Sequence, residues 1–287
     1  MQQGISLEHK MKYILLLPLA VMLLLLITFP TIYSWYLSFH RAVLANYFEM
    51  PFAGLENYLR VLTDSDFWHS VWFSIYYATI VSLIELFLGF SIALFFNRKM
   101  PGKTLIISLF LLPMMVSPAL LGVMFRLLLN DSVGLFTYLL GGVSFLTSEY
   151  LIPVLIVIDV LQWTPFAFLI LYSGLQTVPV ELYEAAAIDG ASPSQNLFYI
   201  TVPAVAPFLV IAALLRWLDS FKVFDMVFVL TGGGPGIMTT SLSIYIYKMA
   251  FQTGDFGRAT AASILVLLAF SMPLVAFVRR ARRGINA

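Results

Sequence analysis

Six stretches of the sequence are each long and apolar enough to cross a lipid bilayer as a helix. A crossing helix needs roughly 20 mostly apolar residues, because its backbone polar groups must be satisfied within the helix itself. The expected spans are 13–39, 71–96, 105–129, 151–175, 202–230 and 259–278. Only 11% of the residues are charged and 61% are hydrophobic, whereas a typical soluble domain is about 25% charged. The sequence therefore predicts an all-α membrane protein, with residues 1–287 forming a single transmembrane domain.

Charge and cysteine content argue against several classes of function. Sixteen Lys and Arg against 15 Asp and Glu give a net charge of +1, which leaves no basic surplus for nucleic acid. The absence of cysteine excludes disulfides, zinc–thiolate sites and thiol nucleophiles. The three histidines, His9, His40 and His69, lie apart in the sequence. The glycine-containing segments 102–104 and 232–236 lack the residue spacing of nucleotide-binding loops. We therefore expect no metal, no cofactor and no catalytic residue in this chain.

The distribution of Lys and Arg predicts the orientation of the chain. Nine of these residues flank the expected spans on one side and five on the other, and the remaining two lie inside the fifth stretch. Because positive residues concentrate on the cytoplasmic side, both termini are expected in the cytoplasm. The loop of residues 176–201 is then cytoplasmic, yet it carries three carboxylates and no Lys or Arg.

A short helix is expected in this cytoplasmic loop, over about 179–190. Pro179 suits a first helical position, Glu181 and Glu184 favour the positive end of the helix dipole, and Gly190 suits a left-handed residue after the end. So short a helix cannot bury both faces within its own protein, which predicts contact with another chain. The residues of its small apolar face are Leu182, Ala185, Ala186 and Ile188.

The same loop carries a recognisable motif. A Glu-Ala-Ala triplet is followed after three residues by a glycine, and after nine more by Ile-x-Val-Pro. The residues concerned are Glu184, Ala185, Ala186, Gly190, Ile200, Val202 and Pro203. This pattern resembles the EAA motif of binding-protein-dependent ABC importer permeases, with Val202 in place of the usual Leu. Segments 54–58, 174–179, 224–235 and 256–262 resemble the carbohydrate-uptake, maltose-type branch, and the likeness covers nearly the whole chain.

The resemblance implies six transmembrane helices with the ABC type I importer permease fold, in a bacterial or archaeal plasma membrane. It also implies the partners: a second and usually different permease subunit, two cytoplasmic ATPases and an extracytoplasmic solute-binding protein. The helix at 179–190 would be the coupling helix that enters a cleft on the ATPase; the alternative is a plain amphipathic loop helix. The implied coupling residues are Glu184, Ala185, Ala186, Asp189 and Gly190.

Ionisable residues inside the expected fifth span have two interpretations. Arg216, Asp219, Lys222 and Asp225 follow one another at intervals of three and alternate in sign. In one interpretation they neutralise each other or tie this helix to neighbouring spans. In the other, a subset that includes Arg216 and Ser220 faces a cavity and binds solute hydroxyls, because intramembrane charges often face water-filled cavities.

The fourth span offers an amide beside aromatic rings, a mixture that suits sugars but is also common in packing. The expected solute-pathway residues are Gln162, Trp163, Phe166, Arg216, Asp219, Ser220 and Lys222. Glu85, isolated in the second span, is expected to bond a neighbouring helix rather than a solute.

The sequence therefore favours the permease subunit of an ATP-driven importer for a sugar, polyol or glycoside. One alternative is a permease of the same family for a phosphorylated polyol or another solute. The other is a self-sufficient ion-coupled secondary transporter, which inverted internal repeats would support; the two halves of the chain share no repeated motif.

Overall fold

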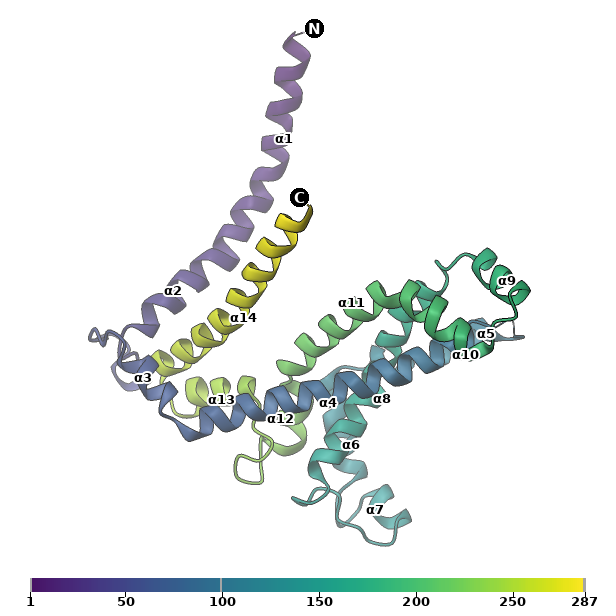
Figure 1. Cartoon of the computed structure of the whole chain (residues 1–287). Helices are drawn as coiled ribbons and strands as arrows, with labels where there is room; N and C mark the ends of the chain where they lie inside the picture. Colours follow the sequence, from purple (N-terminus) through teal and green to yellow (C-terminus); the bar gives the residue numbers. More distant parts are fainter. Residues whose placement is uncertain (1, 99, 286–287) are drawn as a thin grey trace. The chain divides into compact units, whose positions relative to one another are not determined.

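The computed structural model describes residues 2–98 and 100–285, and the regular elements in this part of the chain are all helices (Figure 1). This confirms the expected all-α class. Two compact units are present, residues 1–67 with 246–287 and residues 68–245. Four helical stretches of the described residues are long and apolar enough to cross a membrane, Met11–Ser38, Ser65–Phe96, Leu151–Leu175 and Pro193–Thr231. Pro118–Leu128 and Phe256–Ser271 are shorter apolar helices.

The first unit is built from the two ends of the chain. Its helices are α1 (Gln2–Leu23), a π-helical turn (Leu24–Thr28), α2 (Phe29–Ser38), a 3-10 turn (Leu44–Asn46), α3 (Glu56–Leu62), a π-helical turn (Lys248–Gln252) and α14 (Phe256–Ile285). The first three follow one another without a break, and α14 packs against α2 and α3 (Figure 1).

Polar contacts join α3 to the end of α2, and the residues just after α3 to the start of α14. Buried Asn57 donates from Nδ2 to the carbonyls of Ser38 at 2.9 Å and His40 at 2.8 Å. Arg258 of α14 donates to Asp64 at 2.8 Å. A Cβ at Gly257 would lie 2.5 Å from the His40 carbonyl oxygen, so glycine is required for this approach.

The second unit contains all or most of each remaining element. They are α4 (Ser65–Phe96), α5 (Lys103–Phe110), a 3-10 turn (Leu112–Met115), α6 (Pro118–Leu128), α7 (Leu135–Leu139), α8 (Leu151–Leu175), α9 (Val180–Ile188), α10 (Pro193–Gln195), a π-helical turn (Asn196–Thr201), α11 (Val202–Phe221), α12 (Asp225–Thr231) and α13 (Leu242–Tyr247). The longest are α4, α8 and α11.

Two of the expected continuous helices are interrupted. The stretch 105–129 breaks between α5 and α6, where Pro113 and Pro118 each occupy the beginning of a new helical segment. Proline lacks an amide hydrogen and clashes with the preceding turn, so it is favoured in the first turn of a helix. The stretch 202–230 breaks between Phe221 and Asp225.

Side-chain hydroxyls satisfy the backbone at the second break. Ser241 donates to the carbonyl of Val223 at 2.6 Å, and Ser243 donates to the carbonyl of Lys222 at 3.0 Å. A helix break inside an apolar region requires such partners, because unpaired carbonyls there are costly.

Close helix approach in this unit depends on glycines of α4 and α8. A Cβ at Gly89 of α4 would lie 2.9 Å from the Phe168 amide nitrogen of α8, and one at Gly174 of α8 would lie 2.7 Å from the Phe208 ring of α11. Two apolar clusters flank the middle of the unit. One surrounds Tyr77 and Leu155, and the other surrounds Phe168 and Val205.

Replacing Gly89 with Val should force α4 and α8 apart, because the new side chain would overlap the backbone at Phe168. We expect a loss of about 1–3 kcal/mol in stability, measured as a lower unfolding temperature of the detergent-solubilised protein. Ser91→Val on the same helix is the control, since Ser91 is exposed. Equal effects of the two substitutions would contradict the proposed contact.

Candidate functional site

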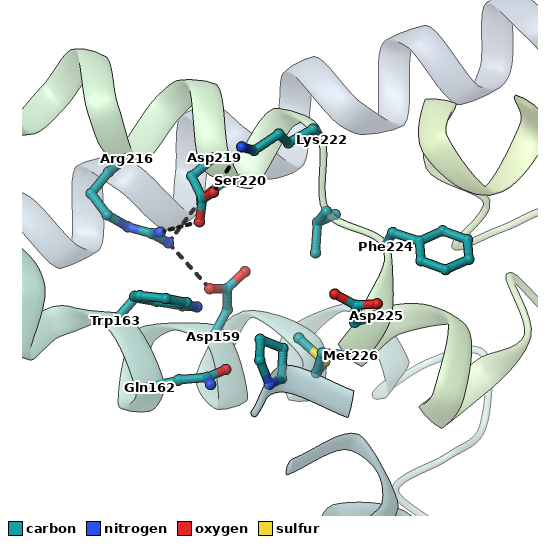
Figure 2. Close-up of a pocket in the computed structure, with 12 residues that line it drawn as sticks. Asp159, Gln162, Trp163, Arg216, Asp219, Ser220, Lys222, Phe224, Asp225 and Met226 are labelled. Carbon is teal, nitrogen blue, oxygen red and sulfur yellow. Dashed lines mark hydrogen bonds and ion pairs between the residues drawn. The ribbon is translucent and has the colours of Figure 1, made fainter. Parts of the chain in front are cut away.

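A cavity of about 340 Å³ lies in the second unit, lined by residues of α8, α11 and α12 and the break between the last two (Figure 2). Six of the expected pathway residues line it: Gln162, Trp163, Arg216, Asp219, Ser220 and Lys222. Phe166, the seventh, does not line it. Its ring meets the Trp163 indole edge-on at 6.3 Å between centroids, so Phe166 packs against a lining residue instead of facing the cavity.

Arg216 of α11 is the centre of a buried network at this cavity. Its Nε and Nη2 donate to the Glu85 carboxylate of α4 at 2.5 and 2.9 Å. Nη2 also donates to Asp159 of α8 at 3.3 Å and to Ser220 at 3.0 Å. The side chains of Arg216, Glu85 and Asp159 are only 2%, 0% and 5% exposed. One guanidinium therefore joins three apolar helices.

A tyrosine completes the network. The Tyr77 hydroxyl of α4 donates to Asp159 Oδ2 at 2.8 Å, so Asp159 accepts from Arg216 on one oxygen and from Tyr77 on the other. Sequence reasoning did not identify Tyr77. The available signal for the network was a single arginine and single carboxylates in three apolar segments, because charged side chains buried there need a partner of opposite charge.

For Arg216, the ion pairs agree with the interpretation in which the charges tie this helix to neighbouring spans. Arg216 ties α11 to α4 and α8, and Glu85 bonds a neighbouring helix as expected. Arg216 nevertheless also lines the cavity, with its guanidinium 5.0 Å from the centre of the Trp163 ring.

Asp219 and Lys222 are more exposed to solvent than Arg216. Asp219 accepts from Arg216 Nη1 at 3.0 Å and lies 3.4 Å from Lys222 Nζ. The side chains of Asp219 and Lys222 are 44% and 70% exposed. The expected placement of all four charges on one helix is wrong, because α11 ends at Phe221 and Asp225 begins α12.

Gln162 joins this site to the other helix break. Its Nε2 donates to the carbonyl of Val116 at 2.8 Å, in the segment between α5 and α6. Pro118, which begins α6, lines the cavity. Both interruptions of helical structure therefore border this cavity.

The helix of the expected cytoplasmic loop is α9, which begins one residue later than expected. Pro179 has an extended backbone and precedes the first helical residue. At the other end Gly190 has the expected positive φ, +73°. The amide of Ala191 donates to the carbonyl of Ala186 at 2.9 Å, which closes the helix end in the manner that a left-handed residue allows.

The expected coupling residues lie together on α9 and just after it. Glu184, Ala185, Asp189 and Gly190 are exposed and Ala186 is half-buried. The apolar side chain of Ile188 is 87% exposed. The Tyr183 hydroxyl lies 3.0 Å from the Thr201 hydroxyl, which links α9 to the beginning of α11.

Comparison with protein families gives one match that covers most of the chain. The model for "binding-protein-dependent transport system inner membrane component" matches residues 85–286. This range contains the cavity, α9 and the residues of the buried network other than Tyr77.

Comparison with curated proteins gives relatives that match nearly end to end. The trehalose/maltose transport system permease protein MalF of Thermococcus litoralis is 37% identical over 267 residues, which cover 91% of this chain and 90% of that protein. The sulfoquinovosyl glycerol transport system permease protein SmoG of Agrobacterium fabrum is 30% identical, covering 95% and 90% respectively.

Among solved structures, a chain of a bacterial ABC transporter involved in the import of the acidic polysaccharide alginate has a TM-score of 0.82. The match covers 100% of both chains at 21% identity, so it shows a shared fold.

Replacing Arg216 with Met should leave Glu85 and Asp159 buried without a cation. We expect a loss of about 3–5 kcal/mol in stability, seen as a large drop in unfolding temperature. Adding Glu85→Gln should restore part of it, because one buried charge is then removed. Arg126→Met is the control, since Arg126 is exposed, and it should cost about 0.5 kcal/mol or less. A small effect of Arg216→Met would refute the structural role of the network.

Proposed function

The chain belongs to the family of binding-protein-dependent transport system inner membrane components, and from this premise we propose that it is one of two permease subunits of an ATP-driven importer for a sugar, polyol or glycoside. Its partners would be a second permease chain, two ATPase subunits and an extracytoplasmic binding protein. ATP hydrolysis would take place on the ATPases, since the sequence contains no nucleotide loop.

The exposed helix α9 is the observation that carries this proposal. Glu184, Ala185 and the apolar side chain of Ile188 are exposed on this helix. A helix with exposed apolar and acidic side chains suits a cleft on another protein, and the ATPase is the partner that the transport cycle requires. Movement of the ATPase would then reach the spans as a rigid-body rotation.

The cavity supports a role in the solute pathway. A sugar needs hydrogen-bond partners for its hydroxyls and an aromatic surface for its C–H face. The cavity offers the Asp219 carboxylate, the Lys222 ammonium and the Trp163 ring within one space (Figure 2). The relative named for trehalose/maltose favours the same class of solute.

The proposed location is a bacterial or archaeal plasma membrane, with both termini in the cytoplasm. Arg98, just after α4, and Lys103, the first residue of α5, are on the same side as α9 in this arrangement, which agrees with the concentration of positive residues on the cytoplasmic side.

Co-purification in mild detergent with the candidate permease, ATPases and binding protein tests the proposal, followed by uptake into proteoliposomes. We expect a complex whose ATPase activity rises with the solute-loaded binding protein and whose uptake requires ATP. Solute accumulation by this chain alone under a proton gradient would support the secondary transporter instead.

Replacing Glu184 with Lys should weaken the ATPase contact and stop uptake, because it reverses the charge that α9 presents. The measurement is the amount of ATPase recovered with the tagged permease, compared with uptake. Glu181→Lys on the same helix is the control, since Glu181 is also exposed. Normal ATPase recovery by the Glu184 variant would rule out this contact, and equal loss in both variants would point to a general charge effect.

A further inference from the structure

The charged groups around the cavity are not balanced. Three carboxylates line it, those of Asp159, Asp219 and Asp225, against two cations, Arg216 and Lys222. Glu85 adds a fourth carboxylate directly behind the Arg216 guanidinium, at 2.5 Å.

Both cations are already engaged with carboxylates. Arg216 contacts Glu85, Asp159 and Asp219, and its side chain is 2% exposed, so it has little surface to offer a solute. Lys222 is exposed, and its Nζ lies 3.4 Å from Asp219.

Asp225 has no such compensation. It is the exposed first residue of α12 and lines the cavity (Figure 2). Within the described part of the chain, no Lys, Arg or His forms an ion pair with it. The cavity therefore presents a free carboxylate to whatever enters.

This arrangement suits a neutral polyhydroxyl solute. Ionised carboxylates only accept hydrogen bonds, and sugar hydroxyls donate them. A solute carboxylate, sulfonate or phosphate would instead lie near several negative groups in a region where apolar helices reduce the screening of charge.

We infer that the cavity selects against anions, so that the transporter carries an uncharged sugar or polyol and rejects sugars that bear a carboxylate, sulfonate or phosphate. This inference rests on the proposed function, because it assigns the charge class of the solute. It also separates this chain from a permease for a phosphorylated polyol.

Thiol labelling can measure the charge of the cavity, because the chain contains no cysteine. A single cysteine would be placed at Val223 or Phe224, which line the cavity, in the full chain within its purified complex. Three methanethiosulfonate reagents are compared, one cationic with a trimethylammonium group, one anionic with a sulfonate and one neutral with a hydroxyl. The intact mass of this chain reports its modification independently of thiols on other subunits.

The reference thiol is Ser194→Cys, at an exposed position outside the cavity. Relative to this reference, we expect the cationic reagent to exceed the anionic one by about tenfold in rate at the cavity thiol. Asp225→Asn should lower this preference by about threefold, and Glu149→Gln, at another exposed carboxylate, should leave it unchanged.

Three labelling results would overturn the inference. The first is an equal normalised modification rate for the cationic and anionic reagents. The second is a preference for the cationic reagent that Asp225→Asn does not change. The third is a cavity thiol that the neutral reagent modifies neither at position 223 nor at position 224. None of these depends on which solute the binding protein holds.

Uptake into proteoliposomes then tests the solute class. Maltose and trehalose serve as neutral probes, and maltobionate and trehalose 6-phosphate as anionic ones, each compared only where the binding protein binds it. We expect ATP-dependent uptake of the neutral probe; equal uptake of a bound anionic probe would overturn the inference. No ATP-dependent uptake of any bound probe would instead count against the proposed function.

Discussion

The guanidinium of Arg216 is the contact on which the arrangement of α4, α8 and α11 depends. Taking three charges out of water is costly, and their mutual attraction offsets this cost only when the geometry is good and the remaining lone pairs are satisfied. Here Arg216 reaches Glu85 with two nitrogens, and Asp159 receives a second hydrogen bond from Tyr77. Apolar side chains could pack in these positions with any of several offsets, whereas the network requires one relative position of the three helices.

The two helix breaks, before α6 and after α11, lie next to the cavity that Arg216 lines. Non-helical backbone at membrane depth is tolerated where it is buried in protein or lines a cavity. Val116, in the break before α6, accepts from Gln162, and the break after α11 receives hydroxyl hydrogen bonds from Ser241 and Ser243. Both breaks adjoin the cavity that Arg216 lines. The polar interior of this unit is therefore built from side chains and backbone together.

The features that depend on neighbouring residues could be predicted from the sequence. Those that depend on contacts between distant parts of the chain could not. The end of α9 at Gly190 follows from a residue that accepts positive φ, and the apolar stretches follow from hydropathy. Pro113 and Pro118 could have predicted the first break, but the apolar composition of the stretch outweighed them. The break after Phe221 has no proline or glycine to mark it, and its hydroxyl partners lie about 20 residues further on.

Glu85 and Arg216 are 131 residues apart, so the sequence could indicate that each needs a partner but not which residue that partner is. Spacing gives the direction of a side chain only approximately, so it could not indicate that Phe166 packs against Trp163 and does not line this cavity.

The network and α9 lie at opposite ends of one helical segment, and this bears on how movement could be transmitted. Helical structure is continuous from Pro193 to Phe221, and its beginning is joined to α9 through Tyr183 and Thr201. The α11 portion of 20 residues is about 30 Å long. Near its far end, Arg216 contacts α4 and α8, which are also joined by the 2.8 Å hydrogen bond from Gln176, just after α8, to Asn97, just after α4. A displacement of α9 would therefore carry α4, α8 and α11 together. The break after Phe221 allows α12 to follow by a different amount, and the cavity between α11 and α12 is where that difference would change its dimensions.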